Sequence, residues 1–549
     1  MPKRTLAVRF VAFLLALAAA WSTTSLLPAQ VRIPREALDV AELDNLLRVG
    51  EQLEQQRRWG EALTHYEDAL RQHPGRPDLE HRLVLARLHY EVARRYSDSS
   101  FVETLNTISE KEALDLYGEV LLKVDSHYVE VPDWRSVVRR GMTAVEVAMG
   151  ESAFYQQSKL PQSENRAKSQ WREISRLFEE RPMRSRHDAR EYAALAARRL
   201  YQESGVAPQA VVLEFACAAG ASLDAYSAFL TGSQLDEVLS QIEGSFVGLG
   251  IELQTRDQTL LIVSVIRGGP ADQAGVRSGE RIVQVDGRSV EDISTDAAAD
   301  MLKGPMGSSV ELVVVSPQGV SRRIRLQRRR VDVPSVEDAA IVEPRSGIAY
   351  MHLTSFQKTT GRDVDSALWK LHRQGMRSLI LDLRRNPGGL LTTAVDVADK
   401  FISRGSIVFT RGRSSGENFD YQAHLIGTWR LPLIVLIDGD SASASEILAG
   451  AIRDHRRGTI VGARSYGKGS VQGIFPLNAA NAGLRLTTAK FYSPNGQAIS
   501  HRGVKPDIIV HTVGRASPDS SAQRVDNDEH DAVLSAAIQV AQQQLTQRP

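Results

Sequence analysis

The chain has 549 residues, of which 42% are hydrophobic and 24% are charged, so it is long enough for several folded domains and has an ordinary globular composition. Its 67 basic and 66 acidic side chains leave a formal net charge of +1. This balance excludes a strong overall field that would attract nucleic acid or an anionic membrane. We therefore expect any partner to be recognised by local sites.

The first residues have the pattern of an export signal. Lys3, Arg4 and Arg9 precede the apolar run 10–21, which has 12 residues. A membrane-spanning helix needs about 20 residues, so the run favours a secretory signal over an uncleaved anchor, although the anchor stays open. We assign residues 1–29 to a signal peptide or N-terminal anchor. We expect an exported protein, periplasmic or extracytoplasmic, either soluble or anchored at its N-terminus.

The single cysteine, Cys217, lies in the mostly apolar run 211–222. One cysteine cannot form an internal disulfide, and without a second cysteine nearby it makes a poor metal site. We predict a buried core thiol rather than a nucleophile. The sequence implies no metal or nucleotide cofactor.

Residues 30–205 have helical periodicity, and 46–79 has a helix–turn–helix pattern of 34 residues that resembles a tetratricopeptide repeat. An ordinary helical hairpin is an equal alternative. A repeat of this kind can dock an adaptor or a second subunit. Residues 206–244 are predicted to be a helical lead-in to the next domains. The individual helices are expected at 112–125, 134–149, 167–180, 214–229 and 234–242.

From Gly244 the hydrophobic pattern becomes alternating, and short β-rich runs with Gly and Pro turns predict a small β domain at 245–329. The segments GGPADQAGV (268–276), SGERI (278–282) and VDGRSV (285–290) together resemble a PDZ domain. The basic run 327–330 at the end of this domain is predicted to be a solvated strand edge.

The resemblance places a peptide-binding loop at Gly248, Leu249, Gly250 and Ile251. Successive backbone N–H groups in a loop that contains glycine can converge on a carboxylate, and the adjoining strand edge can pair with an extended peptide. We therefore expect this loop to receive the C-terminus of a peptide.

Beyond residue 330, strands and helices alternate, which predicts an α/β core at 330–512. One of its strands ends in the loop 382–390, which contains Asn-Pro-Gly-Gly. Glycines there would expose main-chain N–H groups that suit an oxyanion. Taken alone, this loop is better explained as a tight turn before a helix. Strands are expected at 348–353, 379–383 and 433–437, and helices at 363–374 and from Leu391.

A second loop, DGDSASASEI (438–447), contains three serines, Ser441, Ser443 and Ser445. Ser443 and Glu446 fit a helix capping box, which requires no catalysis. Taken alone, the loop does not show which serine, if any, does chemistry.

A third segment favours chemistry, because Lys468 lies between two glycines and precedes Gln472 by four residues. Residues at this spacing lie on one side of a helix or strand. A serine hydroxyl needs a base, and a lysine can be that base when burial keeps it neutral. The combination predicts a Ser–Lys mechanism. A Ser-His-Asp triad stays open, with the base being His352, His372, His424, His455 or His501.

Taken together, the motifs at 112–510 resemble the carboxyl-terminal processing proteases, or tail-specific proteases, which are PDZ-containing Ser–Lys serine peptidases. The resemblance implies that Ser443 is the nucleophile and that Lys468 is the base, since 468 − 443 = 25 is the family spacing. It implies that Gln472 is a third member. It also implies an oxyanion hole from Ala444 and from Gly388 or Gly389.

The fold class that follows is a multidomain α/β protein: a crotonase-like α/β protease core, an inserted β-rich PDZ domain, and an N-terminal helical, tetratricopeptide-like region. Relatives often read LDPHS where residues 223–227 read LDAYS. Glu446 and Asp454 match acidic positions of relatives, and we expect both to give structural support. Residues 513–549 are predicted to be a linker and a C-terminal helix at 532–545, whose one apolar face packs on a neighbour.

The function expected from the sequence is an exported serine endopeptidase whose PDZ domain captures free, apolar C-termini of protein substrates. Two alternatives stay open: a protease that is dormant until a peptide or partner binds, and a non-catalytic PDZ and tetratricopeptide scaffold. The Ser443, Lys468 and Gln472 set argues against the scaffold.

Overall fold

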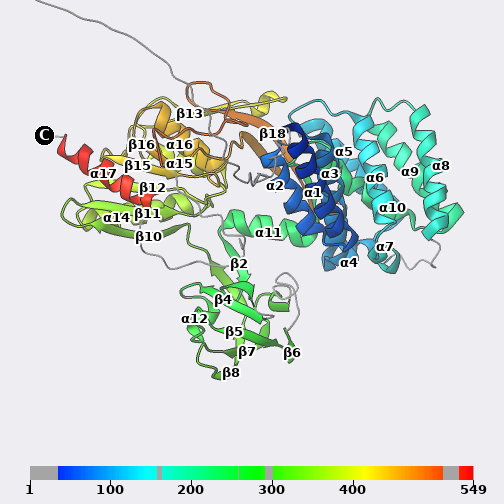
Figure 1. Cartoon of the computed structure of the whole chain (residues 1–549), viewed down its shortest axis with the longest axis horizontal. Helices are drawn as coiled ribbons and strands as arrows, with labels where there is room; N and C mark the ends of the chain where they lie inside the picture. Colours follow the sequence, from blue (N-terminus) through cyan, green and yellow to red (C-terminus); the bar gives the residue numbers. More distant parts are fainter. Residues whose placement is uncertain (1–34, 158–163, 257–258, 291–300, 511–530, 548–549) are drawn as a thin grey trace, which may run out of the picture. The chain divides into compact units, whose positions relative to one another are not determined.

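The computed structural model describes residues 35–157, 164–256, 259–290, 301–510 and 531–547 (Figure 1). The chain divides into two units, Met1–Tyr90 and Glu91–Pro549. The predicted export signal at 1–29 lies outside the described residues. In the described ranges, no helix is long and apolar enough to cross a membrane.

The first unit contains the helix–turn–helix predicted at 46–79. Helix α1 (Arg35–Gln55) is followed by α2 (Trp59–Gln72) and by the start of α3 (Pro77–Ser97). Apolar residues three or four positions apart on α2 face α1 and α3, and Tyr66 at the centre is fully buried. The Tyr66 hydroxyl donates to Glu54 Oε1 at 2.8 Å. The core of this unit consists of Ala62, Tyr66, Ala69, Leu79 and Ala86.

The second unit begins with a helical part. The helices predicted at 112–125, 134–149, 167–180 and 234–242 lie where the sequence predicts them. Caps fix several of their ends: Ser109 and Glu112 form a capping box, and Gly205 ends a helix with φ 79°. Cys217 is buried, as predicted. The helices are α4 (Ser99–Thr107), α5 (Glu110–His127), α6 (Trp134–Ala148), α7 (Ser152–Gln157), α8 (Glu164–Glu180), α9 (Arg186–Ser204), α10 (Pro208–Ala221) and α11 (Gly232–Glu243).

The helix predicted at 214–229 is wrong in its second half, because α10 ends at Ala221. Asp224 Oδ1 accepts the N–H groups of Tyr226 (2.7 Å) and Ser227 (2.8 Å), and these hydrogen bonds form a turn. In a helix, the same N–H groups would instead donate to main-chain carbonyl groups of the preceding turn. The chain then forms β1 (Ala228–Leu230), which pairs antiparallel with β18 (Ala482–Tyr492). This turn brings Tyr226 to the protease core.

The β domain has a sheet with the order β3-β4-β5-β7-β8, and β6 pairs with β5. Its strands alternate: Val310, Leu312 and Val314 are buried on one face, as a sheet with a single covered face requires. The elements are β2 (Ser245–Gly248), β3 (Ile251–Arg256), β4 (Thr259–Val265), α12 (Pro270–Gln273), β5 (Arg281–Val285), β6 (Arg288–Ser289), β7 (Ser309–Val315), β8 (Ser321–Gln327) and β9 (Arg329–Asp332).

Arg328 corrects the prediction that the run 327–330 is a solvated strand edge. Its side chain is buried, and the guanidinium donates to the carbonyl groups of Leu302 (2.7 Å) and Met301 (3.3 Å) and to Ser308 Oγ (3.0 Å). A guanidinium has several N–H donors and can therefore pair with carbonyl groups at the end of a chain segment. The charges along the sequence do not show such a contact. Arg329 and Arg330 are exposed, as predicted.

The α/β core is built on a sheet with the order β10-β11-β12-β15-β16-β19, parallel except for β10. Both faces are covered, which explains the continuous apolar strands. One face packs on α14 (Thr360–Arg373), α15 (Leu391–Asp399) and α16 (Ala444–Asp454). The strands are β10 (Val336–Glu343), β11 (Ile348–Leu353), β12 (Ser378–Asp382), β15 (Leu433–Ile437), β16 (Thr459–Gly462) and β19 (Ile508–Ile509).

The opposite face of this sheet is covered by the C-terminal helix α17 (Ala532–Thr546), drawn in red in Figure 1. Val533, Ala537 and Ala541 are buried against the sheet, which confirms the predicted apolar face. Asp531 caps the helix and pairs with Arg384 at 2.7 Å. Arg384 also pairs with Asp382 at the end of β12, so the helix is tied to the loop that follows this strand.

A second sheet has the order β1-β18-β13-β14, and β17 also pairs with β18. The chain enters this sheet two residues after Lys468, because β17 starts at Ser470. Its further strands are β13 (Ser406–Gly412), β14 (Phe419–Gln422) and β17 (Ser470–Leu477).

Candidate active site

The three serines of the loop 438–447 have different environments. Ser441 and Ser445 are fully buried, and their hydroxyls donate to the carbonyl groups of Leu383 (2.8 Å) and Asn386 (2.9 Å). Ser443 is only half-buried and stands at the start of α16 with φ 55° and ψ −112°. A non-glycine residue with this backbone is strained, and such strain is common at functional sites. These differences favour Ser443 over Ser441 and Ser445 as the reactive serine.

The Asn-Pro-Gly-Gly loop packs directly on Ser443. A Cβ atom placed on Gly388 would lie 2.8 Å from Ser443 Cβ and 2.9 Å from Ala444 N, so only a glycine fits there. Asn386 shapes the loop, since its Nδ2 donates to the Leu353 carbonyl at 2.6 Å and its Oδ1 accepts Gly388 N–H at 2.9 Å. The loop predicted to bind an oxyanion thus lies beside the predicted nucleophile.

The two glycines of this loop differ in their free N–H groups. Gly388 N–H is used by Asn386, whereas Gly389 N–H has no acceptor among the residues that the structure describes. The same is true of Ala444 N–H at the first turn of α16, where a helix leaves its N–H groups unpaired. Gly389 is exposed and Gly388 is buried. These contacts favour Gly389 over Gly388 as the partner of Ala444 in an oxyanion hole.

Replacing Gly388 by alanine is expected to lower kcat about a hundredfold, because the atoms that a Cβ would meet are mostly main-chain atoms and the Ser443 loop has to move. The φ of 105° at Gly388 adds strain to any other residue. Steady-state peptidase kinetics measure the effect. Binding of a C-terminal peptide to the β domain, measured by calorimetry, should stay unchanged, and a variant with wild-type kcat would contradict this geometry.

Glu446 joins the serine loop to the lysine loop. Its Oε2 accepts the N–H groups of Ser443 (2.8 Å) and Lys468 (2.9 Å), and its Oε1 accepts Gly467 N–H (2.7 Å) and Ser465 Oγ–H (2.6 Å). The side chain is fully buried. Burial raises the pKa of Glu446, and the four donors oppose that rise. One carboxylate therefore fixes the main chain at both Ser443 and Lys468.

Lys468 has the electrostatic environment that a lysine base requires. Burial lowers its pKa, and the positive charge of Arg485 lowers it further, while Glu446 and Asp224 act in the opposite direction. A lower pKa leaves more of the amine neutral at neutral pH. The amine lies 4.8 Å from the centroid of the Tyr226 ring. Within the described residues, no hydrogen bond joins Lys468 Nζ to Ser443 or to Gln472.

The Nε2 and Oε1 atoms of Gln472 differ in their contacts. Its Nε2 donates to Thr487 Oγ1 at 3.0 Å and to Ser470 Oγ at 3.2 Å. Its Oε1 is buried and has no partner among the described residues. A buried acceptor without a partner can accept a hydrogen bond from a side chain that moves into reach of it.

The histidines considered as alternative bases have other partners. His455 Nε2 lies 2.8 Å from the Ser406 carbonyl, and His352 Nε2 lies 3.2 Å from the Arg384 carbonyl. Of the histidines that the structure describes, none is hydrogen-bonded to Ser443. The geometry gives the Ser-His-Asp alternative no support. Asp454, the other acidic residue of α16, accepts Ser493 Oγ–H at 2.6 Å, a structural contact.

The loop predicted to bind a peptide joins β2 to β3 in the β domain. The carbonyl groups of Leu249 and Gly250 accept the N–H groups of Ala271 (2.9 Å) and Ile266 (2.8 Å). The N–H groups of Leu249 and Gly250 have no acceptor in the described part of the chain, and Gly250 has φ 76°. Gly248 ends β2, and Ile251 begins β3, the terminal strand of its sheet. This edge can accept another strand.

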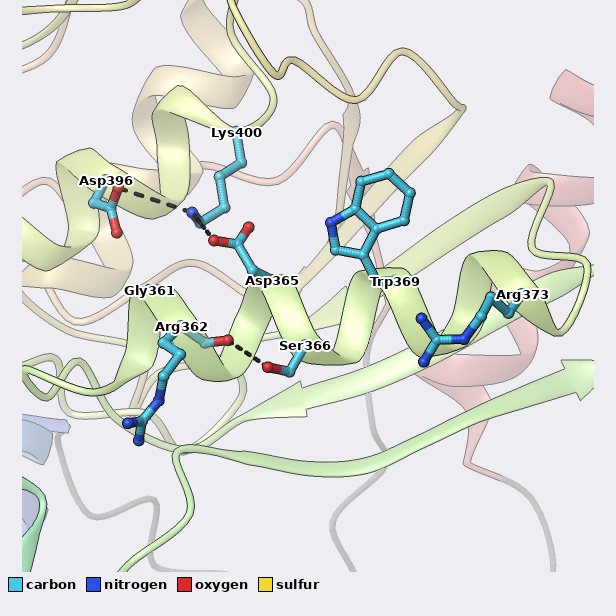
Figure 2. Close-up of a pocket in the computed structure, with 8 residues that line it drawn as sticks. All are labelled: Gly361, Arg362, Asp365, Ser366, Trp369, Arg373, Asp396 and Lys400. Carbon is cyan, nitrogen blue, oxygen red and sulfur yellow. Dashed lines mark hydrogen bonds and ion pairs between the residues drawn. The ribbon is translucent and has the colours of Figure 1, made fainter.

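A separate open groove lies between α14 and α15 (Figure 2). Lys400 pairs there with Asp365 (2.9 Å) and Asp396 (3.8 Å), and Trp369 is half-exposed. The predicted catalytic, oxyanion and peptide-binding residues do not line it. The groove therefore takes no part in the site.

Comparisons with known proteins identify the two domains and the family. Residues 347–510 match peptidase family S41, and residues 261–316 match the PDZ domain. The chain is 40% identical over 294 residues to the carboxy-terminal-processing protease of Bartonella bacilliformis, covering 53% of this chain and 67% of that protein. It is 35% identical over 277 residues to the carboxyl-terminal-processing protease of Synechocystis sp., covering 50% of this chain and 64% of that protein.

Among solved structures, the chain is similar to a photosystem II D1 C-terminal processing protease, with 27% identity, a TM-score of 0.37, and coverage of 72% of this chain and 93% of that one. The matched domains define a serine-type peptidase that carries a PDZ domain. The chain belongs to the family of carboxy-terminal-processing proteases.

Proposed function

We propose that this protein is an exported serine endopeptidase that recognises substrate C-termini through its PDZ domain and cleaves with Ser443 and Lys468. The observation that carries the proposal is the Glu446 carboxylate. One of its oxygens accepts the N–H groups of both Ser443 and Lys468, at 2.8 and 2.9 Å, so nucleophile and base are anchored to one buried point. Among the described residues, no acceptor is found for the N–H group of Ala444, next to Ser443, or of Gly389, next to the Gly388 that packs on Ser443.

The proposed mechanism uses these groups in order. Neutral Lys468 takes the proton of Ser443 Oγ as the oxygen attacks the scissile carbonyl. The N–H groups of Ala444 and Gly389 stabilise the negative charge that develops on the carbonyl oxygen. Lys468 then gives the proton to the leaving amine, and in the second half of the reaction it activates the water that hydrolyses the acyl-enzyme. Gln472 Oε1 orients the amine during both proton transfers.

Substrate selection is assigned to the PDZ domain. The unpaired N–H groups of Leu249 and Gly250 suit a terminal carboxylate, and the open edge of β3 suits an extended chain. The substrates would be proteins with free, apolar C-termini. An adaptor or a second copy of the chain would bind through the helical region 30–205, and export would depend on residues 1–29.

The proposal is tested by cleavage of an unfolded protein with an apolar C-terminus by the wild type, Ser443→Ala and Lys468→Ala. We expect a rate loss of at least about a thousandfold in both variants. A substrate with an amidated C-terminus should be cleaved more slowly by the wild type, since the PDZ loop would lose its carboxylate ligand. Full activity in Lys468→Ala would refute the Ser–Lys pair.

A second candidate is a protease that is dormant until a partner binds. It is favoured by one observation, the absence of a hydrogen bond between Lys468 Nζ and Ser443 among the described contacts. Addition of a peptide that binds the PDZ domain but carries no cleavage site should then raise the cleavage rate of a second substrate. A wild type that binds this peptide tightly and cleaves nothing under either condition would favour a non-catalytic scaffold.

A further inference from the structure

Tyr226 contacts the proposed base from a segment that contains none of the three proposed catalytic loops. Its ring centroid lies 4.8 Å from Lys468 Nζ, within the range of a cation–π contact. Tyr226 comes from the turn between α10 and β1, far from Lys468 in the sequence. Neither the capping box nor the Gly-Lys-Gly motif requires an aromatic residue here.

The main chain at Tyr226 is held by two hydrogen bonds. Its N–H donates to Asp224 Oδ1 at 2.7 Å, and its carbonyl accepts Arg485 Nε–H at 2.8 Å. Burial raises the pKa of the Tyr226 hydroxyl, and the neighbouring Tyr466, two positions before Lys468, raises it further. Tyr466 N–H in turn donates to the Ser441 carbonyl at 3.1 Å, which connects the contact to the serine loop.

The proposed mechanism gives the Lys468 amine a second position, next to Gln472 Oε1. Gln472 Oε1 is buried without a partner among the described residues, and the mechanism places the amine between this oxygen and Ser443 Oγ. A lysine side chain has four rotatable bonds and can move between two such positions while its main chain stays fixed by Glu446. The structure shows the amine on the ring.

We propose that Tyr226 is a positioning residue for the base: its ring holds the Lys468 amine in a resting position, and the amine leaves the ring to act on Ser443. The inference rests on the proposed Ser–Lys function. In the enzyme without substrate, the site is then in a resting state, with the Lys468 amine on the Tyr226 ring.

The groups around the Lys468 amine determine in which direction the loss of the Tyr226 ring shifts its pKa. Burial and Arg485 favour the neutral amine, whereas Glu446 and Asp224 favour the charged one. The π face of Tyr226 also favours the charged amine, and Tyr466 interacts with the Tyr226 hydroxyl. Removing the ring therefore lowers the pH at which the base becomes neutral and frees the amine for Ser443.

The test is the rate at which a small fluorophosphonate labels Ser443, followed by mass spectrometry between about pH 6 and pH 10, a range that brackets a lowered lysine pKa. Tyr226→Leu should shift the midpoint of the profile down by roughly 0.5 to 1 pH unit, and below the midpoint it should label roughly three to ten times faster. Tyr226→Phe keeps the ring and should keep the wild-type midpoint. If Tyr226→Leu has a lower Tm than the wild type, Tyr226→Met provides the same test.

Two outcomes would overturn the inference. One is an unchanged midpoint in Tyr226→Leu and Tyr226→Met, and the other is an equal shift in Tyr226→Phe, which would assign the effect to the hydroxyl. Ser443→Ala and Lys468→Ala separate this failure from a failure of the proposed function. If Lys468→Ala is labelled as fast as the wild type, the Ser–Lys pair itself fails, whatever the Tyr226 variants do.

Discussion

Replacing Glu446 by glutamine is expected to lower kcat by roughly a hundredfold, although the two side chains have nearly the same shape. The carboxylate accepts four hydrogen bonds, two of them from the main chain at Ser443 and Lys468. An amide can place only one oxygen in this buried site, so its NH₂ group would face two donors. The loss of charge-assisted hydrogen bonds corresponds to about 3 kcal/mol, or about two powers of ten in rate.

The matched control for this prediction is Asp454→Asn on the same helix. Asp454 Oδ2 also accepts two hydrogen bonds, from Ser493 Oγ (2.6 Å) and Asn495 N (3.1 Å), but it contacts neither Ser443 nor the lysine loop. We expect Asp454→Asn to change kcat by less than about threefold. Single-turnover kinetics separate acylation from product release. Equal losses in the two variants would show that Glu446 supports the fold of α16 rather than the geometry of the serine and lysine loops.

The largest expected effect on stability comes from Ala537→Asp in the C-terminal helix α17. Ala537 is fully buried against the face of the parallel sheet that contains Ile380 and Ile434. A carboxylate placed there has no partner, and the cost of about 3 kcal/mol or more should lower the Tm by roughly 10 °C or detach the helix. Differential scanning calorimetry and limited proteolysis at the α17 boundary measure the two results.

Gln539→Asp is the control for this prediction, because Gln539 is exposed on the same helix. It should leave the Tm within about 1 °C of the wild type. Detachment of α17 should also lower activity, since Arg384 pairs with Asp531 of the helix cap and with Asp382 just before the Asn-Pro-Gly-Gly loop. A normal Tm and an intact helix in Ala537→Asp would contradict the packing of α17.

The sequence predicts the parts of this molecule that depend on local pattern. Strands buried on both faces appear as continuous apolar runs such as 433–437, and the helices of the core follow capping residues and apolar periodicity. The Gly-Lys-Gly segment is distinctive in residue type, whereas the loops 382–390 and 438–447, taken alone, are also explained as a turn and a capping box. The choice of Ser443 among the three serines followed from the family resemblance. The assignment of Ser443, Lys468 and Gln472 remains a proposal that their geometry supports.

The sequence could not predict contacts that depend on segments far apart in the chain. Tyr226 meets Lys468 because the chain leaves helix α10 early and pairs β1 with β18, against the helical pattern of 214–229. The choice between Gly388 and Gly389 depends on Asn386 Oδ1, which binds one of the two N–H groups. Arg328 is buried because carbonyl groups of another segment need a donor, and no charge pattern along the strand indicates that.

The claim that Lys468 is the base is tested most directly by removing its amine and restoring it chemically. The only cysteine of the chain, Cys217, is buried, and burial raises its thiol pKa to about 12, so it is inert to alkylation. Lys468→Cys should be inactive, and treatment with 2-bromoethylamine, which converts the new cysteine into a lysine analogue, should restore cleavage. Untreated Lys468→Cys that cleaves like the wild type would contradict the account, as would a fully alkylated variant that stays inactive.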